Sequence, residues 1–330
     1  MKIKVSELKK LTHKTLIKQG YNEKEAIIIA DVLLYAQLRG NNQGVVKLIG
    51  RGIPKNPESR PIKIVKNTKL STLFDGGQNM GMLVVKKALD TAITKAKQHG
   101  FAISGTHNTS SSTGAIGYWA KKIAEKNLIG FVFAGSPETV AMHGSYEPIF
   151  GTNPLAIGIP TTKDPIVLDM ATAAMAWFGL VEAKTANRKI PADVAYDKNG
   201  KLTTDPTLAM EGAIRPFDRS YKSAGLSMIV EILTGPLVGA TFVGIGKTNN
   251  WGNLIIALDP NLLTNPAEFR KNMTQLAHKV KSTKKLPGVK EIYLPGERGN
   301  KLTKQHVAKN EIEIEKNLFQ ELKKAAGIES

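Results

Sequence analysis

The sequence predicts a layered α/β fold, with a sheet core and an accessory helical lobe built from both ends of the chain. Between about residues 62 and 260, short apolar stretches typical of strands alternate with helix-like stretches. The segments 1–50 and 266–330 are mostly helix-like. With 330 residues, 42% of them hydrophobic, the chain can bury a large core in two lobes. We therefore expect an N-terminal helical lobe (1–70), on which 266–330 packs, and an α/β core (71–265).

The individual elements follow from periodicity and from turn residues. Ser6 can cap a first helix, Asn22 opens a second, and Gly76-Gly77 and Gly235-Pro236 punctuate the core. The predicted helices are 6–17, 22–38, 80–98, 115–126, 226–234, 266–281 and 315–326. The predicted strands are 62–65, 70–75, 101–104, 129–134, 155–160, 165–169, 251–260 and one ending in a charged turn near 292–298.

The stretch 151–172 is the centre of this organisation. Its second strand ends on the carboxylate of Asp169, and an Ala/Met/Trp run at 170–177 predicts a helix that starts at once. A strand that stops at an acid beside a helix start places a fixed charge and free N–H groups at one sheet edge. Open α/β folds bind ligands at such edges. We expect a binding site there.

A second candidate site is the polar loop 107–120. It follows a predicted strand, contains several serine and threonine residues before Gly114 and Gly117, and opens a predicted helix. Unpaired N–H groups, hydroxyls and a helix dipole bind anions, and a cofactor phosphate is the expected anion. The segment is neither a G-x-G-x-x-G fingerprint nor a P-loop. The alternative is an ordinary serine-rich helix cap.

Composition excludes some classes of protein. There is no cysteine, so disulfides, thiolate metal sites and cysteine nucleophiles are absent, and we expect no metal. No run of about 18 apolar residues predicts a membrane span, and the polar start predicts a cytoplasmic protein. The net charge of +18 raises the alternative of a basic nucleic-acid binder. Because the lysines are spread along the chain, a field that attracts anionic small molecules is the preferred interpretation, without a nucleic-acid partner.

An ordered set of short motifs resembles the malate/L-lactate dehydrogenase family that lacks a Rossmann fold, which includes ureidoglycolate and sulfolactate dehydrogenases and cyclic-ketimine reductases. The matching stretches are Leu38-Arg39-Gly40, Gly151-Thr152-Asn153-Pro154, Leu168-Asp169-Met170-Ala171-Thr172, Thr203-Thr204-Asp205-Pro206, Tyr221-Lys222, Ala257-Leu258-Asp259-Pro260 and Pro295-Gly296-Glu297. The resemblance implies a homodimer with active sites near the subunit interface. It also implies a nicotinamide cofactor, NAD or NADP, on a layered mixed-sheet core.

The resemblance also implies which residues contact the cofactor. They are Ser112, Thr113, Gly114, Ala115, Ile116, Gly117, Ser136, Asp169, Met170, Ala171, Tyr221, Lys222, Gly296, Glu297 and Arg298. Glycines at a helix start suit phosphates, and a lysine can balance their charge.

The catalytic positions depart from the family pattern. Where the family shows Ser-His-Gly followed by an arginine, this chain has Asn42-Gln43-Gly44 and Lys47. The position of a second family histidine is taken by Ser112, and that of the ketimine reductases' aspartate by Gly179. The comparison therefore predicts a divergent member without the usual catalytic histidines. Asn42 and Lys47 are the expected substrate-binding residues.

Alcohol oxidation needs a group that takes the hydroxyl proton as hydride leaves, and reduction needs the reverse. Gln43 and Ser112 can hydrogen-bond a carbonyl but supply no ionisable proton near neutral pH. Lys222 is the first choice for that role, because a partly desolvated lysine has a lowered pKa. The other residues able to replace the histidines are His143, His107 and Tyr118. Gln43, Ser112 and Lys222 are thus the expected catalytic residues.

The sequence favours an NAD(P)-dependent oxidoreductase that transfers hydride between nicotinamide and a small carboxylate substrate. That substrate is a 2-hydroxy or 2-oxo acid such as malate or lactate, or a cyclic imino acid. The alternative is a non-catalytic or vestigial nicotinamide-binding member of the family, which the missing histidines would explain.

Overall fold

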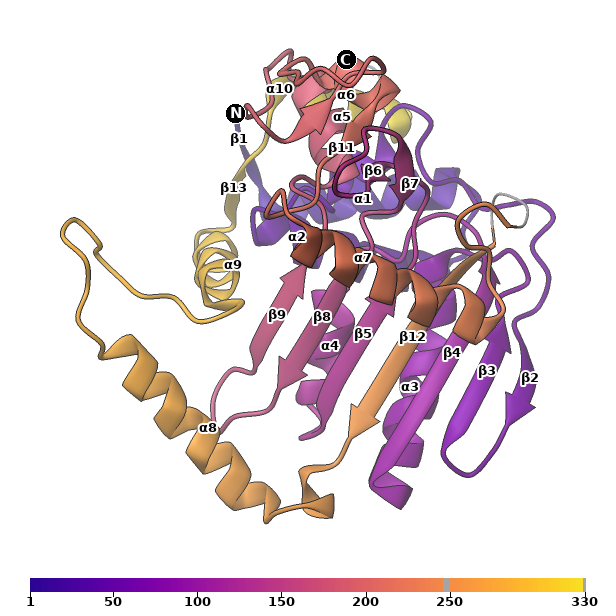
Figure 1. Ribbon diagram of the computed structural model, residues 1–330. Coiled ribbons are helices and arrows are strands. Elements are labelled where there is room, and N and C mark those ends of the chain that lie inside the picture. Colours follow the sequence, from indigo (N-terminus) through magenta and orange to yellow (C-terminus); the bar gives the residue numbers. More distant parts are fainter. Residues whose placement is uncertain (246–249, 329–330) are drawn as a thin grey trace.

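A seven-stranded mixed sheet forms the core of the computed structural model, which describes residues 1–245 and 250–328 (Figure 1). In spatial order the strands are β2 (Lys63–Asn67), β3 (Ser71–Asp75), β4 (Phe101–Thr109), β12 (Trp251–Leu258), β5 (Ile129–Ala134), β8 (Leu155–Ile159) and β9 (Ile166–Met170). Only β3 and β4 pair in parallel; the other neighbours are antiparallel. The predicted layered, mixed-sheet α/β class is confirmed, and the sheet is not the parallel one of a Rossmann fold.

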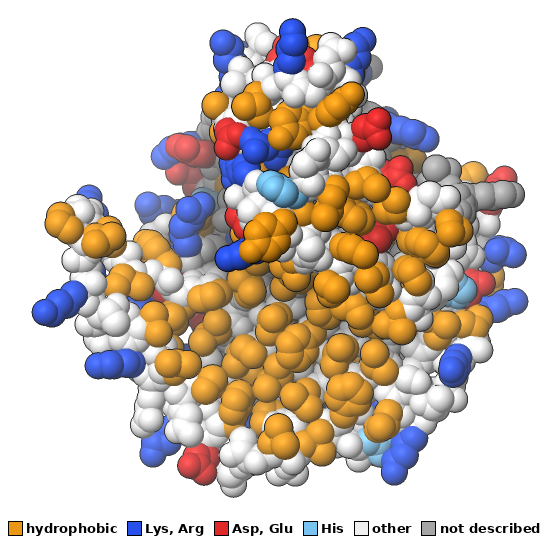
Figure 2. Space-filling view, in the orientation of Figure 1, with side chains coloured by type: hydrophobic (Ala, Val, Ile, Leu, Met, Phe, Trp, Pro, Cys, Tyr) orange, Lys and Arg blue, Asp and Glu red, His pale blue; other side chains and the backbone are white. Residues whose placement is uncertain are grey.

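Helices cover the two faces of this sheet unequally. α3 (Gly81–His99) and α4 (Gly117–Ala124) pack on one face, while α7 (Tyr221–Thr234) crosses only one end of the other (Figure 1). Because side chains alternate along a strand, Val132 of β5 is buried under α3 and α4. Its neighbours Phe131 and Phe133 point to the opposite face and stay partly exposed. A broad apolar surface is therefore left below α7 (Figure 2).

The two ends of the chain lie side by side. β1 (Lys2–Lys4) pairs with β13 (Glu311–Glu313), and α1 (Val5–Lys18) packs against α10 (Lys316–Ala325). α2 (Glu23–Leu38) packs on α9 (Glu297–Lys309), and the 3-10 turn η1 (Val45–Leu48) is enclosed by α1, α2, α5 and α10. α8 (Pro266–Lys281) leans away from these helices (Figure 1). Residues 63–67, which were expected in the N-terminal lobe, form a strand of the large sheet. The division into two domains stays a prediction.

A small four-stranded sheet lies beyond the ends of the central strands. Its strands are β10 (Ala195–Tyr196), β11 (Ala213–Ile214), β6 (Val140–Ala141) and β7 (Pro148–Phe150), with α5 (Trp177–Thr185) and α6 (Pro206–Glu211) nearby. Two further 3-10 turns are η2 (Pro236–Val238) and η3 (Pro260–Leu262). None of the helices in 1–245 and 250–328 has the length and apolar character needed to cross a membrane.

Two predicted elements are wrong. Residues 170–176 do not form a helix, because the N–H of Thr172 donates to Thr152 O and that of Ala174 to Arg215 O; the helix α5 begins only at Trp177. Residues 291–295, where a strand was expected, form no strand either. Instead Gly296, with φ +81°, opens the helix α9, which the sequence did not indicate.

Candidate active site

The loop 112–117 and the end of β9 meet, as the sequence predicted for a shared sheet edge. The backbone N–H of Gly117, at the start of α4, donates to Asp169 Oδ2 at 3.0 Å. A Cβ added to Gly117 would lie 2.6 Å from that same oxygen. Only glycine allows this approach, so the helix start and the carboxylate form one unit. The acid therefore sits beside α4 rather than beside the helix expected at 170–177.

One hollow, the Asp169 pocket, opens on this unit. Its volume is about 460 Å³, and it is lined by Tyr35, Arg39, Gly40, Asn41, Asn42, Val167, Leu168, Asp169, Pro295, Gly296, Arg298 and Gly299. Arg39 connects two walls of the Asp169 pocket. Its Nη2 donates to Gly296 O at 2.7 Å, and its guanidinium lies 4.7 Å from the ring centre of Tyr35. Three predicted cofactor residues, Asp169, Gly296 and Arg298, thus share one pocket.

Asp169 is the ionisable group between the two halves of the site. Desolvation by the surrounding protein raises its pKa to about 6, while the Gly117 N–H and the charge of Arg39 act in the opposite direction. The residue is nonetheless exposed, because it lines an open pocket. Water in that pocket screens the charge, which limits the rise in pKa. Asp169 is therefore predominantly a carboxylate at pH 7.5.

A second hollow, the Lys47 cavity, lies across the same loop. Its volume is about 500 Å³, and its lining is Gln43, Lys47, Gly52, Ile53, Ser111, Ser112, Thr113, Gly114, Ala134, Gly135, Ser136, Pro137, Glu138, Thr139, Thr152, Pro154, Trp177, Phe178 and Trp251. It brings together six predicted site residues from three distant segments: Gln43, Lys47, Ser112, Thr113, Gly114 and Ser136. Asn42 lines the Asp169 pocket instead, next to Gln43.

Lys47 is the most unusual residue of this cavity. It lies on η1, is only 2% exposed, and its Nζ is 3.5 Å from the ring centre of Phe178. Among the described residues it forms no ion pair with any carboxylate. Burial therefore lowers the pKa of the Lys47 amine well below its usual range.

Internal contacts hold the loop between the two hollows. Ser112 Oγ accepts from the Gly114 N–H at 3.0 Å, and Thr113 Oγ1 donates to Asn253 Oδ1 at 2.9 Å. Gly114 has φ +78°, and a Cβ there would lie 2.4 Å from Val32 Cγ1. Another residue would be both strained and crowded at this position. These contacts fix the part of the loop that lines the Lys47 cavity, Ser112 to Gly114.

Several predicted site residues lie elsewhere. Tyr221 is 66% exposed and Lys222 is also exposed at the start of α7, and neither lines the two hollows. His107 and His143 are likewise outside both linings. Tyr118 packs against Tyr35, with ring centres 5.5 Å apart. Five other predicted cofactor contacts flank the two hollows but line neither of them, namely Ala115, Ile116, Gly117, Met170 and Ala171.

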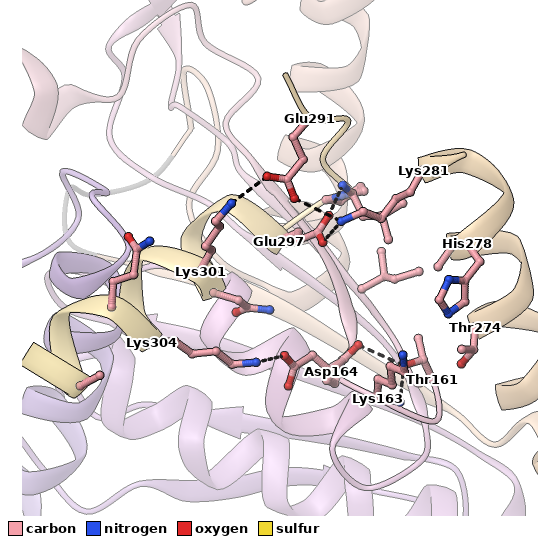
Figure 3. Close-up of a pocket in the computed structure, with 18 residues that line it drawn as sticks. Thr161, Lys163, Asp164, Thr274, His278, Lys281, Glu291, Glu297, Lys301 and Lys304 are labelled. Carbon is pink, nitrogen blue, oxygen red and sulfur yellow. Dashed lines mark hydrogen bonds and ion pairs between the residues drawn. The ribbon is translucent and has the colours of Figure 1, made fainter. Parts of the chain in front are cut away.

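Glu297 points into a third hollow, of about 710 Å³, between the turn 161–166, α8 and α9 (Figure 3). There it pairs with Lys281, while Lys301 contacts Glu291 at 2.7 Å and Lys304 contacts Asp164 at 2.6 Å. These lysines already have carboxylate partners. The third hollow is therefore lined by a network of ion pairs and is separate from the Asp169 pocket and the Lys47 cavity.

Several residues of the site were not expected from the sequence, among them Arg39 as a contact and Glu138, Trp177 and Trp251 as cavity walls. Glu138 could have been found, because Ser136-Pro137-Glu138 follows the end of β5 at the same sheet edge. The two tryptophans carry no such signal, since they reach the cavity only through tertiary packing.

Comparison with known proteins agrees with this architecture. The profile of the family described as malate/L-lactate dehydrogenase matches residues 3–323. The malate/(S)-sulfolactate dehydrogenase of Methanothermus fervidus is 36% identical over 99% of this chain and 97% of its own length. An Escherichia coli O157:H7 ureidoglycolate dehydrogenase (NAD(+)) is 30% identical over 98% of this chain and 95% of its own. The solved sulfolactate dehydrogenase of Methanocaldococcus jannaschii superposes with a TM-score of 0.81 at 34% identity, covering 99% and 98% of the two chains.

The mixed seven-stranded sheet, with Asp169 at the end of β9 against the start of α4, gives a layered α/β fold that differs from the parallel Rossmann sheet. The chain belongs to the malate/L-lactate dehydrogenase family.

Proposed function

We propose that the protein is an NAD(P)-dependent oxidoreductase that transfers hydride between nicotinamide and a small carboxylate substrate. The substrate class is a 2-hydroxy or 2-oxo acid, or a cyclic imino acid. The observation that carries this proposal is the loop 112–117, which forms a wall of the Lys47 cavity and ends against Asp169. The named relatives, a malate/sulfolactate dehydrogenase and a ureidoglycolate dehydrogenase, act on substrates of this chemical class.

The cofactor would lie across that loop. Its adenosine part would occupy the Asp169 pocket beside Gly296 and Arg298, and its nicotinamide would reach the Lys47 cavity past Ser112 and Ser136. The chain fits such a ligand, because Ser112, Thr113 and Ser136 place polar groups along the wall of the Lys47 cavity. The buried Thr139 Oγ1 in the cavity wall also has no hydrogen-bond partner within 1–245 and 250–328. The bound nicotinamide supplies or accepts the hydride.

The substrate would occupy the Lys47 cavity, with the Lys47 ammonium facing its carboxylate. An ion pair would there replace the solvation that burial removes from the amine. Gln43 and Ser112 can hydrogen-bond the carbonyl or hydroxyl group at the reacting carbon. The expected contacts from Met170, Ala171, Tyr221, Lys222 and Glu297 remain predictions, as does a cytoplasmic location.

Steady-state oxidation of NADH and NADPH against a panel of 2-oxo acids and cyclic imino acids tests this function. We expect turnover well above background with at least one cofactor and one member of the panel. The alternative is a vestigial nicotinamide-binding protein; the observation in its favour is that the described lining of the Lys47 cavity contains no histidine. Calorimetric binding of NAD(P)H without turnover on any substrate would establish that alternative, whereas absence of cofactor binding would exclude both.

We also propose that the protein is a homodimer that buries the apolar face below α7. Exposed apolar side chains continue along α7 and the adjoining turn η2, namely Met228, Ile229, Ile232 and Leu237. They adjoin the uncovered sheet face, where Phe133 of β5 and Leu233 of α7 pack against one apolar cluster. An apolar area of this extent on an isolated chain is typical of a subunit interface.

Placing charges on this face is expected to separate the subunits. The double substitution Ile229→Glu with Ile232→Glu puts two carboxylates where the partner would pack, and burying an unpaired charge is strongly unfavourable. Analytical ultracentrifugation should then show a monomer where the wild type is a dimer. The matched control is Ile27→Glu, at an equally exposed position (53%) on α2, which should stay dimeric. A monomeric wild type would contradict the proposal.

A further inference from the structure

The amine of Lys47 is a buried titratable group whose charge no carboxylate in 1–245 or 250–328 balances. It faces the Lys47 cavity against Phe178, and the acidic residues of the elements packed around η1 form no ion pair with it. Those residues are Glu7 on α1, Glu23, Glu25 and Asp31 on α2, Glu182 on α5 and Glu321 on α10. Glu25 pairs with Lys55, and Glu182 with Arg188. An amine in this position can serve to hold an anion, to exchange a proton, or to do both.

We propose that Lys47 is the acid–base catalyst of this site, a role that rests on the proposed function and goes beyond binding the substrate carboxylate. In reduction, a bound reduced nicotinamide would supply the hydride for the new C–H bond at the carbonyl carbon of a 2-oxo acid. The π electron pair of the C=O bond moves to oxygen, which takes a proton from Lys47 Nζ. The products are the 2-hydroxy acid, the oxidised cofactor and a neutral Lys47 amine, which recovers its proton from solvent. Oxidation follows the same steps in reverse.

The surroundings of Lys47 suit both of its protonation states. The neutral amine is tolerated because Phe178 and Trp177 provide an apolar wall, and burial already disfavours the charged form. When a 2-oxo acid binds, its carboxylate restores the ammonium by charge attraction. The three N–H donors of an ammonium group can then contact a carboxylate oxygen and the neighbouring carbonyl oxygen together. One lysine thus positions the substrate and delivers the proton.

The other polar residues of the cavity do not offer this chemistry. Gln43 and Ser112 do not ionise near neutral pH. Among the described residues, the only other titratable side chain in the lining is Glu138, which is exposed. Asp169 lines the pocket on the far side of the loop, and Lys222 lies outside both linings. Lys47 is therefore the enclosed proton donor within reach of a substrate in the cavity.

The decisive variant is Lys47→Arg. A guanidinium keeps the positive charge and can hold a carboxylate, but it does not release a proton near neutral pH. We expect kcat to fall by about 10²-fold or more, the size typical of a lost general acid or base. KM for the 2-oxo acid and the affinity for oxamate, a 2-oxo acid analogue, should change only a few-fold. The pH dependence of kcat that the wild type owes to Lys47 should also disappear.

Three further variants complete the test. Lys55→Arg, at an ion-paired lysine outside both hollows, is the matched control and should keep the wild-type kcat. Lys47→Ala should regain part of its lost turnover when ethylamine is added, because a free amine can enter the vacated space. Lys222→Met should retain the wild-type pH profile of kcat.

The results separate this inference from the proposed function. A wild type that binds NAD(P)H but reduces no member of the panel refutes the function itself. A wild type that is active, together with a Lys47→Arg variant of near-normal kcat and unchanged pH profile, overturns only the role of Lys47. If the pH dependence of kcat is lost in Glu138→Gln or in Lys222→Met but kept in Lys47→Arg, the proton donor is Glu138 or Lys222, respectively, and not Lys47.

Discussion

The Lys47→Met variant is expected to be more stable than the wild type at pH 7, by about 1–3 kcal/mol, although it should lose its activity. Methionine has a similar length and is apolar, so it fills the same space against Phe178 without the desolvation of an unpaired amine. Urea unfolding of the two proteins without ligands measures the difference. A lysine that lowers the stability of the folded protein at this position is expected if Lys47 belongs to a functional site.

The difference in unfolding free energy between Lys47→Met and the wild type should shrink as pH rises. Burial lowers the pKa of Lys47 in the folded state, so between that pKa and the unfolded value of about 10.4 the unfolded chain binds more protons. Wild-type stability attributable to this group therefore increases with pH over that window, whereas Lys47→Met lacks the effect. Lys55→Met is the control and should be destabilised, because it breaks the 2.8 Å ion pair with Glu25. A Lys47→Met variant less stable than the wild type at pH 7 would contradict an unpaired buried amine.

Gly117→Ala is expected to weaken NAD(P)H binding by about tenfold or more. The new Cβ would lie 2.6 Å from Asp169 Oδ2 and 2.8 Å from Asp169 Cβ, so the acid must move and its hydrogen bond to the Gly117 N–H is lost. The helix start and the Asp169 pocket would then no longer share one surface. Calorimetric titration with NADH and NADPH measures the change.

A double-mutant cycle shows whether this loss passes through Asp169. If the clash with Asp169 is the cause, Asp169→Ala should also weaken binding, and the double variant should be no worse than the weaker single variant. Two single variants that bind the cofactor like the wild type would show that it does not lie on this unit. Additive losses would mean that Gly117 acts independently of the acid.

The fold could be predicted from the sequence wherever local pattern and final packing agree. β5, β8, β9 and β12 were predicted within two residues of their observed ends, because apolar runs bounded by turn residues match buried central strands. The run 170–176 has helical character, but backbone hydrogen bonds to Thr152 and Arg215 override it. The helix α9 is polar, with no buried residue, so it gave no periodic apolar signal.

The site was predictable only in part. The proximity of the loop 112–117 to Asp169 followed from both segments ending at one sheet edge. The burial of Lys47 did not, since it depends on α1, α2, α5 and α10 enclosing η1 from four parts of the chain. Lys222 was the expected proton carrier from its place in a motif, yet in the single chain it lies on the exposed start of α7. Motif order identifies neighbours along the chain, while tertiary packing decides which amine is desolvated.

The most direct test of the central claim is a fluorescence titration with NADH and NADPH, exciting tryptophan and recording nicotinamide emission. Trp177 and Trp251 line the Lys47 cavity, so a nicotinamide bound there would receive their excitation energy. We predict saturable nicotinamide emission with at least one cofactor, and loss of that signal when a 2-oxo acid substrate is added and the cofactor is oxidised. Absence of energy transfer and of binding with both cofactors would contradict a dinucleotide site across the loop 112–117.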